Sequence, residues 1–197
     1  MQGLRLFIKR YRWLRAGARY VVPLLIGFSL HLTAHAVVYL KPQEALKQLF
    51  ADSDVVKADK KTLTAADRQK LSEILGYSIT AETVTFFVGY SGDKIDGYAL
   101  MDQQIGKTQP ITFMILLGPD GVVREIEVLA YQESQGSQIR YTRFREQFRG
   151  KDRTDPLRVG QDIQNITGAT LSVRATTETV RRALVLWNLF YGSPSKP

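Results

Sequence analysis

The feature that most constrains the fold is an uncharged run of 21 residues from Tyr20 to Leu40. As a helix rising about 1.5 Å per residue, this run is about 31 Å long, close to the hydrocarbon thickness of a bilayer. Tyrosines lie at its two ends, where interfacial aromatic residues are common. The 19 residues before it carry six basic side chains and no acidic one, and the positive-inside tendency keeps such a tail in the cytoplasm. The sequence therefore predicts a single-pass anchor in the cytoplasmic (inner) membrane, with the C-terminal domain on the periplasmic or extracellular side.

A cleaved signal peptide is the alternative interpretation of this segment. The apolar run from Val21 to Thr33 has a suitable length, and Ala34-His35-Ala36 has the small-residue pattern of a cleavage site. The long basic tail before the run and the apolar residues after it favour a retained anchor. Both interpretations export the rest of the chain.

Two histidines, His31 and His35, are four residues apart in the apolar segment and so share one helix face. Placing a polar histidine ring inside a membrane costs free energy, so such histidines are often functional, for example as haem ligands. Packing or hydrogen bonding against a partner helix is the simpler interpretation. The sequence leaves a haem contact open.

The net charge of +8 is unevenly distributed, because six positive charges lie in the first 19 residues. The later basic run, residues 140–153, is interrupted by acids, so no nucleic-acid partner is expected. The chain has no cysteine, which excludes disulfides, iron–sulfur clusters and a cysteine nucleophile. Its only histidines lie in the apolar segment, so neither a catalytic triad nor a metal site is predicted for the rest of the chain. Redox chemistry would require an added cofactor.

The segment that follows the apolar run is expected to be helical over residues 41–76. Residues 41–61 are predicted to form a juxtamembrane helix, with an apolar stripe that begins at Ala45. A second helix has Thr64 as its N-cap and Gly76 as its C-cap.

Four strand-like runs come next, at residues 82–91, 94–104, 110–118 and 122–131. Their connections are too short for parallel crossovers, so the strands are expected to be antiparallel neighbours. Helices are predicted at residues 139–150 and 175–191, which completes an α+β fold: an antiparallel β-sheet packed with helices, preceded by one N-terminal transmembrane helix. The expected organisation is a basic cytoplasmic tail (1–19), a transmembrane anchor (20–40), a juxtamembrane helical segment (41–76) and a folded domain (77–192).

Small and hydroxylated residues, Thr167-Gly168-Ala169-Thr170, crowd together just before the last predicted helix. Exposed N–H groups at the positive end of a helix dipole suit a phosphate group. Gly168 allows a close backbone approach, and the two threonines offer hydroxyls. The alternative is an ordinary helix start that Thr170 or Ser172 caps.

This TGAT string resembles the flavinylation motif of the FMN-binding domains in Rnf- and Nqr-type redox complexes, whose pattern is Asp-x-x-Ser/Thr-Gly-Ala-Thr. Two more segments resemble that family in the same order, Glu133-Ser134-Gln135-Gly136 and the EQFRGK sequence at residues 146–151. The resemblance extends over roughly residues 84–190. It implies FMN joined to Thr170 by a phosphoester bond (threonyl-FMN), which a separate flavin transferase attaches.

The resemblance also implies which residues surround the flavin. The phosphate would lie at the N–H groups of the first helical turn, and the loop that begins at Glu133 would cover the ring. The implied cofactor-binding residues are Thr167, Gly168, Ala169, Thr170, Leu171, Ser172, Glu133, Ser134 and Gly136. The motif's aspartate falls on Gln164 here, and the nearest acid is Asp162, so attachment would be slow or absent if the transferase reads that carboxylate.

The function that follows is a membrane-anchored, exported flavoprotein that carries electrons for other subunits of a membrane electron-transfer complex, without a substrate or catalytic residue of its own. Two alternatives remain open. The chain is either a binding or assembly subunit that keeps the fold with non-covalent or no flavin, or an unrelated exported domain whose TGAT string is a helix cap.

Overall fold

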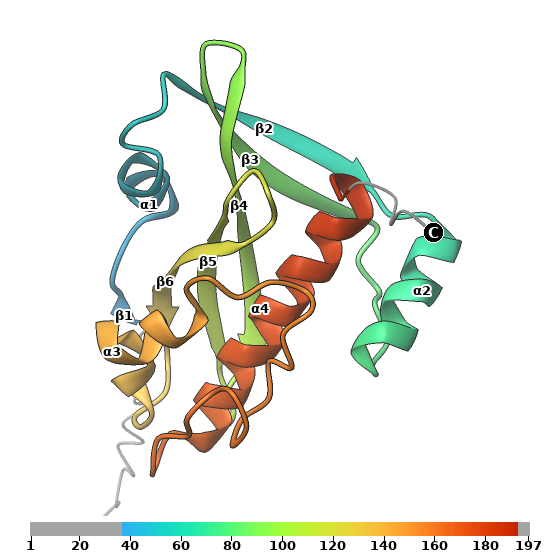
Figure 1. Ribbon diagram of the computed structural model, residues 1–197. Helices are drawn as coiled ribbons and strands as arrows, with labels where there is room; N and C mark the ends of the chain where they lie inside the picture. The colour runs from blue at the N-terminus through green and yellow to red at the C-terminus, as the bar shows by residue number, and fades with distance from the viewer. Residues whose placement is uncertain (1–36, 193–197) are drawn as a thin grey trace, which may run out of the picture. The chain divides into compact units, whose positions relative to one another are not determined.

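The computed structural model describes residues 37–192, all of which lie in one compact unit (Figure 1). The predicted basic tail and nearly all of the predicted anchor, with its two histidines, lie outside these residues. Within residues 37–192, no helix is long and apolar enough to cross a membrane.

The centre of the fold is a six-stranded antiparallel sheet with the strand order β1-β6-β5-β4-β3-β2. Its strands are β1 (Val37–Val38), β2 (Val55–Thr62), β3 (Thr83–Ser91), β4 (Lys94–Ile105), β5 (Pro110–Leu117) and β6 (Val123–Tyr131). The four predicted strands correspond to β3, β4, β5 and β6, which pair as antiparallel neighbours in chain order. The α+β class and the antiparallel sheet are therefore confirmed.

The helical elements are α1 (Pro42–Leu49), α2 (Ala65–Leu75), α3 (Thr142–Arg145) and α4 (Thr170–Phe190), with short 3-10 turns at Ser137–Arg140 and Glu146–Phe148. The predicted caps of α2 are confirmed. The Thr64 hydroxyl accepts the N–H of Asp67 at 3.1 Å, and the Asp67 carboxylate accepts the N–H of Thr64 at 2.9 Å. Gly76 ends the helix with φ +83°.

Three helix predictions are wrong in extent. The predicted helix 41–61 stops after α1, and its second half is strand β2, which pairs with β3 along its whole length and so joins the segment 41–76 to the sheet. The predicted helix 139–150 is broken into short α3 and two 3-10 turns. The last helix begins at Thr170, five residues earlier than predicted, and the first turn that the prediction missed is buried at Ser172 and Val173.

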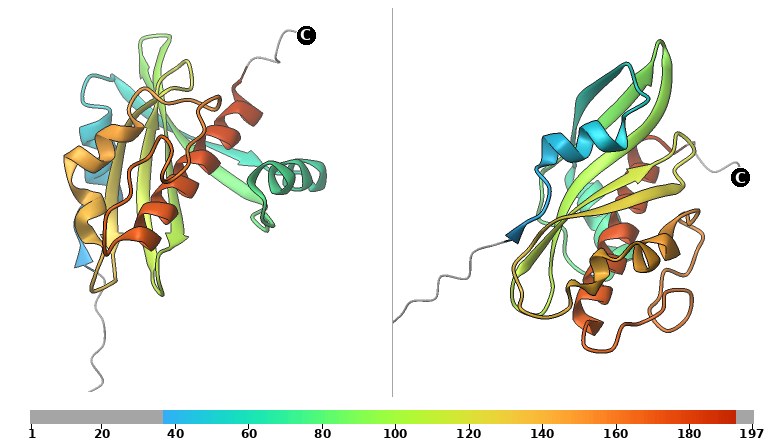
Figure 2. Two further views of the ribbon diagram at one scale, coloured as in Figure 1. Left: turned by 60° about the horizontal axis from the view of Figure 1, so that its bottom comes forward. Right: turned by 90° about the vertical axis from the view of Figure 1, so that its left-hand side faces the viewer.

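Helices cover both faces of the sheet, as Figure 2 shows in its right-hand view. The main core lies between α4 and one face, which contributes Phe86, Phe113 and Ile115. On the opposite face, Ala45 of α1 and the neighbouring Phe50 pack on a smaller cluster. Since α4 crosses the central strands, the position of its first residue, where the TGAT string ends, is fixed by the core.

Candidate functional site

The TGAT string forms the entry to α4. Gly168 has φ +83° and open space where a Cβ would be, and Ala169 is the N-cap. No side chain caps the helix start, since Thr170 is already its first residue and the buried Ser172 hydroxyl lies against Tyr131, so the capping role considered for Thr170 or Ser172 is wrong. Within residues 37–192, no hydrogen bond uses the N–H groups of residues 170–172. These three donors point out of the helix end as free anion-binding groups.

Thr170 is the first residue of α4, and its side chain is half-buried. Its hydroxyl oxygen accepts a hydrogen bond from the amide nitrogen of Asn165 at 3.0 Å. Thr167 and Gly168 are exposed beside it, and Leu171 keeps 44% of its surface exposed. The hydroxyl is therefore held in place on an accessible face of the protein.

The loop at residues 133–136 packs against this helix start. The Tyr131 hydroxyl lies 2.9 Å from the Ser172 hydroxyl and also donates to the carbonyl of Gln135. Gly136 lies against this pair with φ +94°. Burial raises the pKa of the Tyr131 phenol, so it stays protonated and keeps its hydrogen bonds at neutral pH.

The side chains of that loop do not all turn toward Thr170. The Glu133 carboxylate accepts the N–H groups of Thr108 at 2.7 Å and Gln109 at 3.0 Å, which ties it to the β4–β5 turn. Ser134 is exposed. Glu133 therefore fixes the loop position, and the contact with the first turn of α4 comes from Tyr131 and Gly136.

The EQFRGK segment holds the chain that leads into the TGAT string. The side-chain oxygen of Gln147 accepts the N–H of Gln164 at 2.7 Å, and the Lys151 ammonium lies 2.9 Å from the Asp162 carboxylate. Asp162 also accepts the N–H groups of Leu157 and Arg158. Burial favours the neutral form of Asp162, but these N–H groups and Lys151 outweigh it and lower the pKa of Asp162. Asp162 therefore holds the chain segment at residues 157–162 in place.

The residues at this helix start fit a phosphate group. Helix α4 is 21 residues long and has no acidic residue in its first turn, so nothing there competes with an anion for the N–H groups. The open space beside Gly168 leaves room for it, and exposed Leu171 offers an apolar surface next to Thr170. No group of three or more histidine, aspartate or glutamate residues suited to a metal ion occurs in the described part of the chain.

Two residues at the site, Tyr131 and Asn165, were not predicted from the sequence. Tyr131 ends a strand in an apolar stretch and looks like an ordinary core residue. Asn165 lies within the quoted motif region, but its contact with Thr170 depends on the turn at Gly168, which spacing alone does not describe.

We expect Gly136→Ala to destabilise the protein by about 3 kcal/mol, because strained backbone and steric overlap act together. An added Cβ would lie 2.4 Å from the Ser172 hydroxyl and 2.5 Å from the Tyr131 hydroxyl. Urea denaturation measures the change. Gly160→Ala is the matched control, because Gly160 has φ +86° but open space at the Cβ position, so it tests backbone strain alone, at about 1 kcal/mol. Equal losses in the two variants would contradict the predicted clash.

These observations define a class of protein: an α+β domain with an anion-binding helix start. The last helix of the domain begins at an accessible threonine, and the N–H groups of its first turn are free. Residues 106–185, from the β4–β5 turn through most of α4, match the family model of the FMN-binding domain. The chain is also 26% identical over 166 residues to one subunit of the proton-translocating ferredoxin:NAD(+) oxidoreductase complex of Clostridium ljungdahlii, an alignment that covers 80% of this chain and 83% of that protein. The predicted resemblance is therefore confirmed: residues 106–185 are similar to the FMN-binding domain, and the longer match to the clostridial subunit supports the likeness to flavin subunits of such redox complexes.

Proposed function

We propose that this chain is a membrane-anchored, exported flavoprotein that relays electrons through an FMN joined to Thr170 by a phosphoester bond. The observation that carries the proposal is the placement of an accessible threonine hydroxyl at a helix N-terminus with free N–H groups, inside an FMN-binding domain. When bound, FMN supplies one- and two-electron transfer chemistry.

The roles of the surrounding residues follow from their contacts. The N–H groups of Thr170, Leu171 and Ser172 would neutralise part of the phosphate charge. Thr167, Gly168 and Ala169 form the open turn that leaves space for it. The loop of Glu133, Ser134 and Gly136, fixed at one end by the β4–β5 turn and at the other by Tyr131, would bound the ring site.

The relative in Clostridium ljungdahlii is named as part of an oxidoreductase complex, which supports a similar setting for this chain. We propose that other subunits of a membrane electron-transfer complex are its electron donor and acceptor, and that a flavin transferase matures it. The anchor would be residues 20–40, with residues 1–19 in the cytoplasm and the folded domain on the periplasmic or extracellular side. In this arrangement the chain is an electron-transfer subunit rather than a stand-alone enzyme.

A second candidate function is supported by one observation at the site. Gln164 replaces the motif's aspartate, its side chain is exposed, and the nearby Asp162 is already paired with Lys151. A binding or assembly subunit that keeps the fold, with non-covalent or no flavin, would show this replacement.

The mass of the intact protein distinguishes the two functions. After co-expression with a flavin transferase, the proposed function predicts an increase equal to FMN less one water, and flavin absorbance that persists after denaturation. An unmodified mass without flavin absorbance would exclude the covalent carrier and favour the assembly subunit.

We expect Gln164→Asp to increase the rate of flavin attachment, since it restores the motif's carboxylate at an exposed position where the transferase can reach it. The rate is measured as the modified fraction against time with purified transferase. Gln161→Asp adds the same charge at another exposed position of the same segment and should leave the rate unchanged. If both variants respond alike, added charge explains the effect and the motif position has no special role.

A further inference from the structure

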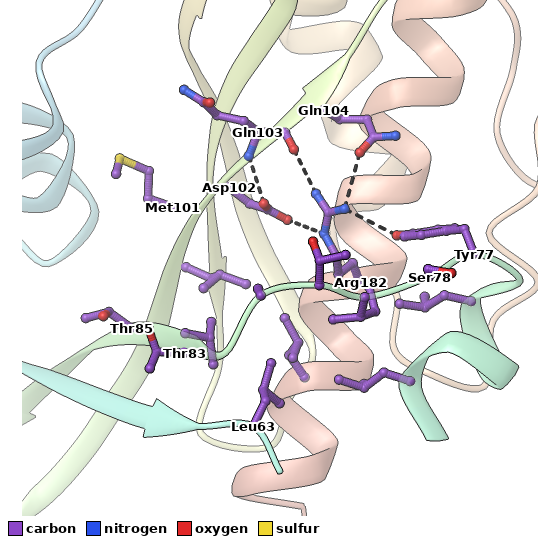
Figure 3. Close-up of a pocket in the computed structure, with 18 of the residues that line it drawn as sticks. Leu63, Tyr77, Ser78, Thr83, Thr85, Met101, Asp102, Gln103, Gln104 and Arg182 are labelled. Atoms are coloured by element: carbon purple, nitrogen blue, oxygen red, sulfur yellow. Dashed lines mark hydrogen bonds and ion pairs between the residues drawn. The ribbon is translucent and has the colours of Figure 1, made fainter. Parts of the chain in front are cut away.

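A cavity of about 680 Å³ lies away from the TGAT string, between α2, residues 77–82, β3, β4 and α4 (Figure 3). This volume is within the range of small-molecule sites. None of the predicted flavin-site residues lines it. On α4, its lining residue Arg182 is twelve residues from Thr170, a distance of about 18 Å along the helix axis. The cavity is therefore separate from the proposed flavin attachment site.

Most of the apolar wall is aliphatic. Leu71 and Leu75 come from α2, Leu100 comes from β4, and Leu186 comes from α4. Leu63, Ile79 and Val84 complete this wall. The lining has two aromatic residues, Tyr77 at the polar end and Phe87, which packs against the smaller cluster on the opposite face of the sheet. The wall itself is therefore mainly branched aliphatic, which favours a saturated chain over a stacked planar ring.

A group of polar side chains surrounds Arg182, and Figure 3 shows this group at the end away from Leu63, whereas Thr83 and Thr85 lie near Leu63. The guanidinium donates to the Asp102 carboxylate at 2.6 Å, to the Gln103 carbonyl at 2.8 Å and to the Gln104 side-chain oxygen at 3.2 Å. It also donates to the Tyr77 hydroxyl at 3.3 Å. Burial acts against the charged form of Arg182, but Asp102 outweighs it and raises the pKa of the guanidinium, which therefore keeps its charge.

This pairing restricts the charge of an occupant. The single cation in the lining is already neutralised by Asp102, and all three guanidinium nitrogens already donate. An anionic head would meet the Asp102 carboxylate, and a cationic head would meet Arg182, so either would bury an unpaired charge. Within residues 37–192, the side-chain amide nitrogen of Gln104 has no hydrogen-bond partner, so it can serve an uncharged head.

We infer that this cavity binds an uncharged single-chain amphiphile, with its aliphatic chain along the wall of Leu71, Leu75 and Leu186 and its oxygen-bearing head at the Tyr77–Arg182 end. The inference does not depend on the flavin.

Photoaffinity labelling of the purified full chain tests the inference. The probe is monodecanoylglycerol with a diazirine in its chain, used below the concentration at which it forms micelles. We expect adducts in the peptides of α2 and β4 that line the cavity, and competition by unlabelled monodecanoylglycerol. Decanoate, with the same chain and an anionic head, should compete roughly tenfold less well. Labelling that does not respond to the competitor, or equal competition by decanoate, would overturn the inference.

A matched pair of variants on α2 checks the location. Leu75→Trp fills the cavity and should remove most of the competed labelling. Ile74→Trp places the same side chain at the neighbouring position, which is 47% exposed and outside the lining, and should leave labelling unchanged. Circular dichroism verifies that both variants fold. Should Leu75→Trp misfold, Leu186→Phe narrows the same wall from α4, and undiminished labelling in a folded wall variant contradicts the inference.

Discussion

Replacing Thr170 by alanine is expected to give a folded protein with no covalent flavin. The change removes the only atom at this position that can form a phosphoester bond, while the free N–H groups of the helix start remain. Because the Thr170 side chain makes one hydrogen bond, from exposed Asn165, the free energy of unfolding should change by only about 1 kcal/mol. Intact mass and flavin fluorescence after denaturation measure the outcome.

Two further variants identify the attachment atom. Thr170→Ser keeps a hydroxyl at the same backbone position and should retain flavin at a reduced rate. Thr167→Ala removes the other hydroxyl of the string, which is exposed and three residues earlier, and should keep the full mass increase. Covalent flavin that persists in Thr170→Ala but is lost in Thr167→Ala would assign the bond to Thr167 instead.

The parts of the fold that were predictable from sequence are those whose signals are local. The β3–β6 strands are apolar runs separated by glycine-containing turns, and their antiparallel order follows from the shortness of those turns. Helix α2 has a hydroxyl at its start and a glycine at its end, and both cap it in the structure. Short-range chemistry is enough for such elements.

The errors occur where a distant partner decides the structure. Strand β2 is rich in lysine and resembles a helical continuation of α1, but it pairs with β3, which lies beyond helix α2 and a loop along the chain. The first turn of α4 has little apolar periodicity, and it is helical because Ser172 and Val173 are buried against the rest of the domain. Tertiary contacts override local preference at both places.

The functional sites also differ in how far the sequence predicts them. The TGAT string and the loop at residues 133–136 were found by motif, and the structure brings them together through Tyr131 and Ser172. Their roles toward FMN stay a prediction. The cavity at Arg182 has no linear motif, because its walls come from several segments that are far apart in the sequence, so only the folded structure reveals it.

The Asp102–Arg182 pair lets the electrostatics of that cavity be tested through stability. The two side chains are 22% and 15% exposed and 2.6 Å apart, so water compensates each charge only weakly. We expect Asp102→Ala to reduce the free energy of unfolding by about 4 kcal/mol, because it leaves the Arg182 guanidinium buried without its counter-charge. Urea denaturation at neutral pH measures the loss.

The double variant Asp102→Leu/Arg182→Leu separates the loss of a partner from the value of the pair itself. It removes both charges, so it should recover most of the stability that Asp102→Ala loses. Glu146→Ala is the surface control, since the Arg149–Glu146 pair is 56% and 48% exposed and should contribute less than about 1 kcal/mol. If the double variant is as unstable as Asp102→Ala, the loss of stability does not come from an unpaired charge on Arg182. Charge pairing would then not select an uncharged occupant. If the double variant recovers the free energy of unfolding, Asp102 and Arg182 neutralise each other in the folded protein, and their pairing makes the cavity lining neutral.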